Sequence, residues 1–471
     1  MIALLALLAN TAAAAPLGLE GFLDQVSAQN RQLRAARQAA EGYEKASDEG
    51  TLLLAPTLDG DLHFVDDQKP TSNPLFLGDR TKYASYSLGL SKLFTTGTTA
   101  RLSYTLATTD VRGASPVFLP QARFAEARPV LELTQSLWRN GFGATTRADQ
   151  RRLEAQAEGA RFSAAYAAKQ ALAAAETAYY RLALARESVR VERESLDRAG
   201  KMREWTSRRV RLQLADRADL LQSEAALQLR RLELQAALDD ERAASRAFNA
   251  ARELDSDEVT DELAAFDEAV VAKLELPKRA PAREDTLAAR ARDVVDEATA
   301  ESMLQTLSPD ILLYGNVGYN GRDVTDGTAL SDSLSSKHPT WVAGLKFTAP
   351  LDLPTIFRSR DGQKLVRAAA RDQYERAVFE EETQWKDLTR AFGEAKTRYG
   401  LSGAIESAQR EKLVHEKDRF ARGKTTAFQV LTFEQEYLVA ALARIRSESE
   451  ILRIHAQLKT FAATPAAGGA R

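Results

Sequence analysis

The chain has 471 residues, of which 28% are charged, and its 64 Lys and Arg nearly balance its 66 Asp and Glu. This balance leaves no net positive field for nucleic acid, and the absence of cysteine excludes disulfides, a thiol nucleophile and a cysteine metal site. The four histidines have no spacing that would place two of them on one metal ion, so we expect neither a metal nor any other cofactor.

The N-terminal 15 residues are an apolar run of Ile, Leu and Ala that ends in small residues at 11–15. This pattern predicts a signal peptide over residues 1–15, cleaved next to Ala15, and the alternative is a buried N-terminal helix. Because no Lys or Arg precedes the apolar run, we expect the true start codon to lie upstream. No other stretch has the roughly 18 apolar residues of a transmembrane helix, so export leads to the periplasm, the outer membrane or the exterior.

The remainder of the chain has one pattern twice: a helix, strands of period two, and a long helical hairpin. In the first repeat, residues 16–253, we predict strands over 58–65, 83–92, 99–108 and 130–138 and a helical hairpin over 144–253. In the second repeat, residues 283–462, we predict strands over 310–320 and 340–348 and a helical hairpin over 355–462. Residues 254–282 are predicted to be a connecting segment and 463–471 a disordered tail.

The predicted hairpins contain helices of about sixty residues, which rise about 90 Å and exceed a globular domain. Leucines at near-heptad spacing, such as Leu220, Leu227 and Leu234, indicate a coiled-coil seam. The many alanines allow close approach on more than one side, which favours a wall of helices with two neighbours each. An ordinary solvated coiled coil with one apolar stripe is the alternative.

The predicted strands alternate strictly between polar and apolar residues. Small polar side chains occupy one face, and the other face carries the residues that we predict to face lipid: Tyr86, Leu88, Leu90, Leu102, Tyr104 and Leu106. Strands of about ten residues, long loops at one end and tight turns at the other are typical of membrane β-barrels. A water-soluble sandwich with a polar outer face is the alternative.

Nearly the whole mature chain resembles the TolC-type outer-membrane efflux proteins, the outer-membrane factors of tripartite efflux and type I secretion systems. The resemblance rests on the repeated unit, on the strand-to-helix passages 134–141 and 348–351, and above all on the segment RFARGKTTAFQVLTFE at 419–434. A weaker first copy of that segment lies at 217–225.

The resemblance implies an α+β membrane protein: a homotrimer that shares one β-barrel in the outer membrane, continued by a long α-helical coiled-coil barrel into the periplasm. It also implies two partners, a periplasmic adaptor and an inner-membrane pump, and the function of a passive exit duct. The alternative function is an exported coiled-coil scaffold or adhesin without a pore.

The residues themselves favour the same architecture. Only helices and closed barrels satisfy backbone polar groups in lipid, and four to six strands in one chain are too few to close a barrel, so several chains must share it. The sequence has no nucleophile elbow and no glycine-rich phosphate loop, and we therefore expect no enzymatic activity.

The resemblance departs from the family pattern at the periplasmic gate. The family's second hairpin carries aspartates that form an anionic ring, and Gln429 and Thr432 occupy the matching positions here. We predict a gate closed by ion pairs between the two hairpins, or by aromatic side chains, and the alternative is a set of merely exposed charges. The predicted gate residues lie near the two helix breaks: Asp216, Asp219, Phe420, Arg422, Lys424, Phe428, Gln429 and Thr432.

The first repeat contains a surplus hairpin, residues 83–108, that has no counterpart in the second repeat. If both arms enter the barrel, each chain supplies six strands instead of the family's usual four, and a trimer closes about eighteen strands instead of twelve. The competing interpretation folds this hairpin outward as an extracellular flap.

Overall fold

The computed structural model describes residues 16–264, 271, 273–335 and 337–463. The predicted signal peptide and all but the first residue of the predicted tail therefore lie outside the described residues. The chain divides into two compact units, and each takes segments from both halves of the sequence. The helical unit comprises the described residues of Met1–Glu41, Arg161–Leu287 and Ala377–Arg471, and the sheet unit comprises Gly42–Ala160 and Ala288–Arg376. The compact units thus do not follow the order of the predicted repeats.

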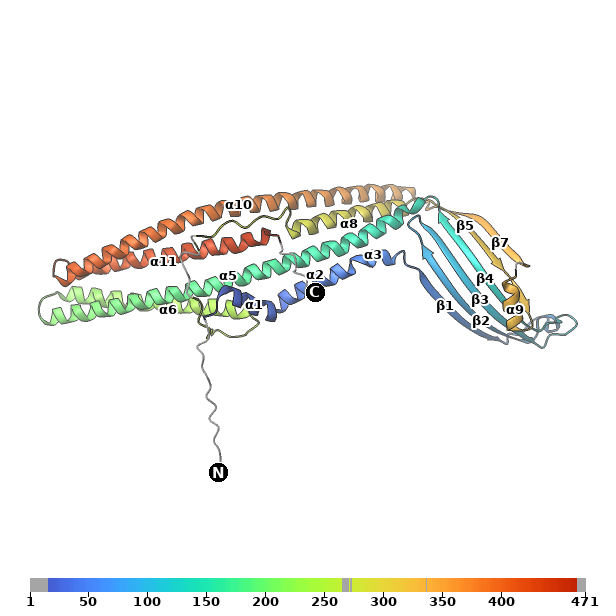
Figure 1. The fold of residues 1–471 in the computed structure, drawn as a ribbon, viewed down its shortest axis with the longest axis horizontal. Helices are drawn as coiled ribbons and strands as arrows, with labels where there is room; N and C mark the ends of the chain where they lie inside the picture. Colours follow the sequence, from blue (N-terminus) through green and yellow to red (C-terminus); the bar gives the residue numbers. More distant parts are fainter. Residues whose placement is uncertain (1–15, 265–270, 272, 336, 464–471) are drawn as a thin grey trace, which may run out of the picture. The chain divides into compact units, whose positions relative to one another are not determined.

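The sheet unit contains one antiparallel sheet with the order β1-β2-β3-β4-β5-β7, and the short β6 pairs with β4 (Figure 1). Its strands are β1 Thr57–Asp67, β2 Arg80–Leu93, β3 Thr98–Arg112, β4 Arg123–Ser136, β5 Asp310–Tyr319, β6 Gly321–Asp323 and β7 Pro339–Thr348. The arms of the surplus hairpin are β2 and β3, which lie inside the sheet, and the edges are β1 and β7.

The register gives the sheet one apolar face. Leu88 lies opposite Tyr104, and Leu90 lies opposite Leu102, so these side chains project from the same side. Leu62 of β1 and Leu345 of β7 extend this face toward the two edges, and each is 69% exposed in the single chain. The other face carries small polar side chains such as Ser87 and Thr105, which lie opposite each other.

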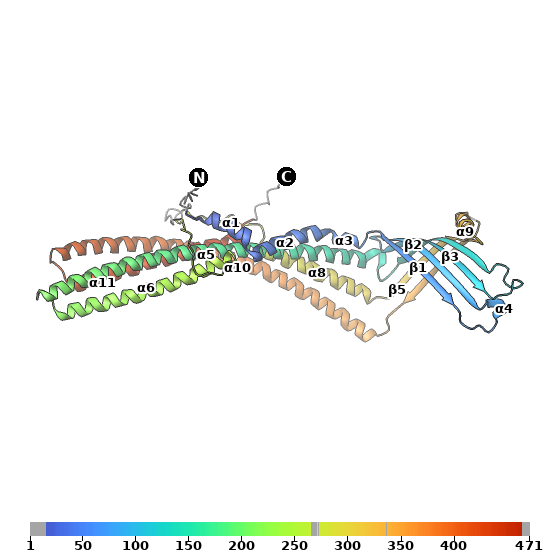
Figure 2. The ribbon, with the colours of Figure 1, turned by 90° about the horizontal axis from the view of Figure 1, so that it is seen from below.

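A helix covers part of the apolar face where the sequence analysis expected only a loop. Helix α9, Asp326–Ser333, packs on β3 and β4 (Figure 2). Its Ala329 is buried against Ala125 and Ala127, and the Tyr104 hydroxyl lies 2.8 Å from Ser333 Oγ. The prediction that Tyr104 and Leu106 face lipid is therefore incomplete, since α9 leaves both only partly exposed.

Strand β4 begins at Arg123, seven residues before the predicted start at 130. Ala125 and Ala127 are small because α9 lies over them, so this end of the strand lacks the large apolar residues that mark the alternation elsewhere. A second short helix, α4 Pro74–Leu77, lies in the loop between β1 and β2.

The helical segments next to the sheet form a row in which each neighbouring pair is in contact. These segments are α2 Arg31–Lys45 with η1 Ala46–Asp48 and α3 Glu49–Leu52, the start of α5 Ala144–Arg211, α8 Glu284–Thr306, and the start of α10 Leu353–Ala421. A Cβ on Gly50 would lie 2.9 Å from Glu154 of α5, and a Cβ on Gly159 would lie 3.0 Å from Ala291 of α8. An ion pair between Glu297 of α8 and Arg367 of α10 completes the row. Small residues at these contacts permit the close approach.

The turn between β2 and β3 packs against the segment that connects β4 to α5, and we call this contact the seat of the turn. The connecting segment contains the short helix η2 Gly141–Gly143. Arg147 Nη1 donates to the Thr95 carbonyl at 3.3 Å, and Gln135 Nε2 donates to the Thr96 carbonyl at 3.2 Å. Gly143 has a φ of +81°, and a Cβ at this position would lie 1.8 Å from the Thr95 carbonyl oxygen. Only glycine fits this contact.

Replacing Gly143 with alanine should therefore loosen the seat of the turn. We expect Gly143→Ala to lower the free energy of unfolding by more than the roughly 1–2 kcal/mol of a left-handed backbone, because the methyl group also collides with Thr95. Gly141→Ala is the matched control, since a Cβ there meets nothing within 4 Å. Thermal unfolding in detergent measures both variants, and equal melting temperatures would contradict the proposed seat.

The helical unit contains two long helical hairpins and helix α1 Leu19–Gln29. The first hairpin is the rest of α5 with α6 Arg217–Ala251, and the second is the rest of α10 with α11 Ala427–Leu458, which η3 Lys459–Phe461 follows. One core cluster joins α5, α10 and α11 through Leu184, Phe392 and Leu438, among others. A second joins α1 to the first hairpin, where the Phe22 and Phe248 rings stack 4.2 Å apart.

The predicted connecting segment, 254–282, is described except for 265–270 and 272. In this segment Leu263 forms an isolated β-bridge with Leu17, and Arg279 forms one with Ala462. Both ends of the segment are therefore fixed to other parts of the helical unit. Among the residues that the structure describes, no helix is both long enough and apolar enough to cross a membrane.

Candidate functional site

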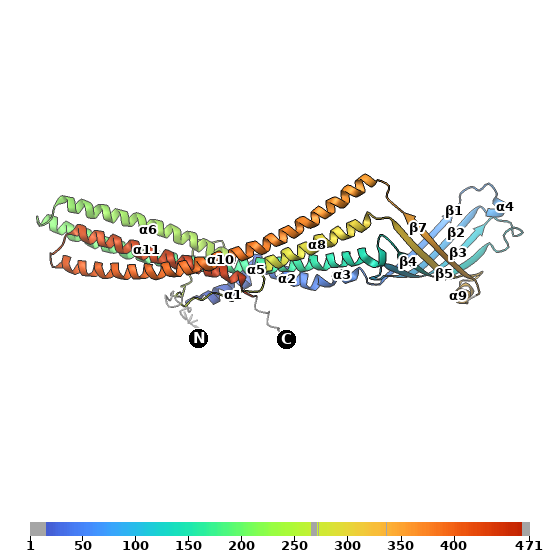
Figure 3. The same ribbon diagram turned by 90° about the horizontal axis from the view of Figure 1, so that it is seen from above.

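The two helical hairpins turn at the same end of the helical unit (Figure 3). Both loops begin with a residue in the left-handed conformation, Gln213 at φ +60° and Gly423 at φ +70°. The backbone N–H of Leu214 bonds the Arg209 carbonyl at 2.8 Å, and that of Lys424 bonds the Arg419 carbonyl at 3.0 Å. This is the usual way to end a helix, and it gives both loops the same geometry.

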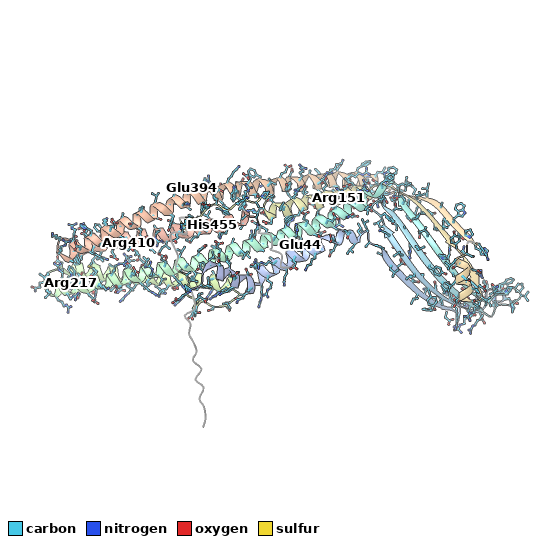
Figure 4. All side chains as sticks on the ribbon, in the orientation of Figure 1. Glu44, Arg151, Arg217, Glu394, Arg410 and His455 are labelled. Carbon is cyan, nitrogen blue, oxygen red and sulfur yellow. The ribbon has the colours of Figure 1, made fainter. Side chains whose placement is uncertain are left out.

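The predicted gate residues of the first loop serve the helix that follows it. Asp216 is the N-cap of α6, and its side chain forms a capping box with Asp219 three residues later. Arg217, between them, begins the helix (Figure 4). The two aspartates therefore already bind backbone N–H groups at the helix start.

The predicted gate residues of the second loop also bind locally. Arg422 pairs with Asp418 of its own helix. Gln429 Oε1 accepts a hydrogen bond of 3.2 Å from the Thr425 hydroxyl, and the Thr432 hydroxyl donates to the Phe428 carbonyl at 3.0 Å. Within the described part of one chain no ion pair joins the two loops, so pairs of Asp216 or Asp219 with Arg422 or Lys424 stay a prediction for contacts between chains.

The two aromatic gate candidates have different surroundings. The Phe420 ring centroid lies 4.1 Å from that of Trp205 on α5, and Phe420 is only 9% exposed. The Arg209 guanidinium lies over the Trp205 ring, 4.6 Å from its centroid. Phe428, in contrast, is 57% exposed. Phe420 thus joins the two hairpins, and only Phe428 is free to project from the chain.

Next to the loops, buried ion pairs tie the hairpins together. Glu434 of α11 is buried and accepts from Arg198 of α5, and its other oxygen lies 3.1 Å from Lys417 of α10. Arg230 of α6 donates to Gln435 of α11. These residues were not predicted from the sequence, because a buried charged residue on a long helix cannot be distinguished from an exposed one until the neighbouring helices are known.

Arg444 of α11 is the centre of the largest such cluster. Its guanidinium nitrogens lie 2.5 Å from Glu187 of α5, 2.6 Å from Glu406 of α10 and 2.7 Å from Glu448 of α11. Burial acts to lower the pKa of Arg444, but Glu187 and Glu406 outweigh it, so the pKa lies above its usual value. Arg410, on α10 (Figure 4), adds a second positive charge 2.9 Å from Glu406.

The helical unit contains a hollow lined by charged side chains. A hollow of about 470 Å³ between α5, α6 and α11 is lined by Glu192, Glu233 and Arg181, among others. Burial, reinforced by the nearby Glu233, raises the pKa of Glu192. Among the described residues no group of three or more His, Cys, Asp or Glu is arranged to hold a metal ion.

The folds of solved outer-membrane channels match this chain. The outer-membrane channel OprN aligns with a TM-score of 0.63 and 18% identity, over 94% of this chain and 89% of that chain. The CmeC outer membrane channel of Campylobacter jejuni aligns with a TM-score of 0.63 and 15% identity, over 94% and 84% of the two chains. The MtrE outer membrane channel of Neisseria gonorrhoeae, in its open state, aligns with a TM-score of 0.62 and 18% identity, over 94% of this chain and 88% of that chain.

These identities are low, and the likeness shows a shared fold. No protein-family model matches the sequence, and no match was found among the curated proteins. At the level of the fold, the resemblance to TolC-type outer-membrane proteins that was expected from the sequence is confirmed.

Replacing Arg444 tests whether the buried cluster stabilises the helical unit. Arg444→Met should lower the free energy of unfolding by roughly 3–5 kcal/mol, because three glutamates would keep their charges without their common partner. Arg453→Met on the same helix is the control, since the pair of Arg453 with Glu450 is partly exposed and should be worth about 0–1 kcal/mol. Denaturant unfolding followed by circular dichroism compares them, and equal losses would show that the cluster adds nothing.

Proposed function

We propose that this chain is the outer-membrane exit duct of a tripartite efflux or type I secretion system and works as a homotrimer. The observation that carries the proposal is the two-faced sheet with unpaired edges. Its apolar face is largely exposed in the single chain, its other face is polar, and β1 and β7 each have one side without a partner strand. The shared fold with outer-membrane channels supports it.

Closing the sheet with copies of itself satisfies both features. Pairing β1 of one chain with β7 of the next bonds the free backbone groups, which lipid does not solvate. The apolar face then contacts lipid and the polar face lines water. On the polar face Arg101 lies 2.6 Å from Asp59, and Arg322 lies 3.6 Å from Glu126, so charges of both signs are paired there.

The helices support the remainder of the proposal. The row of helical segments next to the sheet can continue into neighbouring chains, and the hairpin loops of the helical unit expose Leu212, Leu214 and Phe428. These loops are the surface that we propose for the periplasmic adaptor and, through it, the inner-membrane pump. The duct itself carries out no chemistry, and the pump selects the cargo.

The proposed duct should behave as a channel. We expect the purified protein to run as a heat-sensitive trimer in mild detergent, because each chain provides only part of the hydrogen-bonded barrel wall. In planar bilayers it should give discrete single-channel currents. A monodisperse monomer without conductance would instead support an exported scaffold or adhesin.

The gate makes a separate prediction. If ion pairs between chains hold the loops closed, Asp219→Ala with Arg422→Ala should raise the conductance of the isolated channel, since each partly exposed pair is worth roughly 0.2–1 kcal/mol and occurs three times. If closure is steric, Phe428→Ala should raise it instead. Arg217→Ala is the control, because it removes a charge at the same level that was not predicted to take part. A response to Arg217→Ala of the same size would refute a specific gate.

A further inference from the structure

We infer that the hairpin β2–β3 is part of the barrel wall, so that the trimer closes eighteen strands and the membrane pore is as wide as the ring of helices next to it. This inference rests on the proposed function, since it needs three copies around one pore. Its competitor is a twelve-stranded barrel from which the hairpin folds away as an extracellular flap.

The ladder of hydrogen bonds is the first argument. Every residue of β1, from Thr57 to Asp67, has a partner in β2, and β2 and β3 are paired from Arg80 to Arg112 along their whole lengths. β3 in turn pairs with β4 over thirteen residues, Thr98 to Asp110. Moving the hairpin out of the sheet would break both the β1–β2 and the β3–β4 ladders, and β1 would have to pair with β4 in their place.

The side chains of the hairpin are the second argument. Leu88 and Leu102 project from the same face as Leu131 of β4, which lies directly opposite Leu102. Leu88 is 57% exposed and Leu102 54% exposed in the single chain. In lipid this exposure is favourable, whereas a flap in water would keep these apolar side chains exposed to solvent, which is unfavourable relative to burial.

The seat of the turn is the third argument. Thr95 and Thr96 accept hydrogen bonds from Arg147 and Gln135, at the end of the sheet where β4 passes into α5. Gly97, at φ +74°, completes this seat, since a Cβ there would lie 2.9 Å from the Asn140 carbonyl oxygen. An outward flap would hinge at the opposite end and would lose all of these contacts.

The widths of the two rings agree with six strands per chain. Four helical segments per chain stand next to the sheet, and twelve helices about 9 Å apart make a ring of about 108 Å circumference. Eighteen strands about 4.8 Å apart and tilted by about 40° span about 113 Å, but twelve span only about 75 Å. The corresponding backbone diameters are about 36 Å and about 24 Å. With eighteen strands the duct therefore does not narrow where helices give way to strands.

Cysteine labelling in outer membranes tests the placement of the hairpin. With a membrane-impermeant maleimide, Ser87→Cys and Ser103→Cys should react, and Leu88→Cys and Leu102→Cys should react at least tenfold more slowly. Glu132→Cys and Leu131→Cys on β4 are the matched controls, because β4 belongs to the wall in both models. Fast labelling of all four hairpin positions would overturn the inference, even while the β4 pair behaves as expected.

A density map of the trimer gives the strand count directly, and polymer exclusion measures the width. Wild-type channels should admit neutral polymers about 1.5-fold larger in radius from the outer side than a variant in which residues 68–122 are replaced by a short turn, which would join β1 directly to β4. Twelve strands in the map would overturn the inference and leave the exit-duct function intact. Failure to trimerise or conduct would instead refute the proposed function. If the deletion variant does not fold, the map and the labelling still decide.

Discussion

The constraint on which the structure depends is the hydrogen-bonding capacity of the two sheet edges. Among the described residues, β1 and β7 each have one side without a partner strand. Lipid does not solvate such an edge, and in water an open edge tends to pair with other chains. In the proposed trimer, pairing between copies would satisfy these edges and would direct the apolar face outward and the polar face inward. The exposed leucines and aromatic residues of the sheet would then contact lipid.

The helical unit depends on contacts of two kinds, apolar and ionic. Apolar contacts such as Phe22 with Phe248 hold α1 to the first hairpin. Between the hairpins an apolar cluster that includes Leu184, Phe392 and Leu438 is accompanied by buried ion pairs, from Arg198 with Glu434 to Arg444 with its three glutamates. Buried ion pairs tolerate little misplacement, so they define one arrangement of the two hairpins and make departures from it costly. Close to the loops Trp205 of the first hairpin contacts Phe420 of the second.

Much of this fold could be predicted from the periodicity of apolar residues and from residue propensities. Where the predicted elements differ from the structure, the causes can be identified. The alternation in β2 and β3 is read directly because both faces are open, whereas β4 was predicted too short because Ala125 and Ala127 make room for α9. Gly423 marks a helix break, but Gln213 takes the same left-handed conformation without any sequence signal. Neither the contact of Phe420 nor the partners of Arg444 could be predicted, since both depend on which helices become neighbours, and that information lies in no local pattern.

The seat of the β2–β3 turn also has a mechanical consequence. β1, β4, β5 and β7 are each joined in sequence to a helical segment, whereas β2 and β3 end in the Thr95–Gly97 turn. A rotation of the helices would thus displace four of the six long strands through the covalent backbone. The other two, β2 and β3, would be displaced only through their hydrogen bonds to neighbouring strands and to the start of α5. The β2–β3 hairpin is therefore the part of the sheet that is not connected in sequence to any of the long helices. If the proposed duct opens by a rotation of its helices, this hairpin would keep the circumference of the barrel constant.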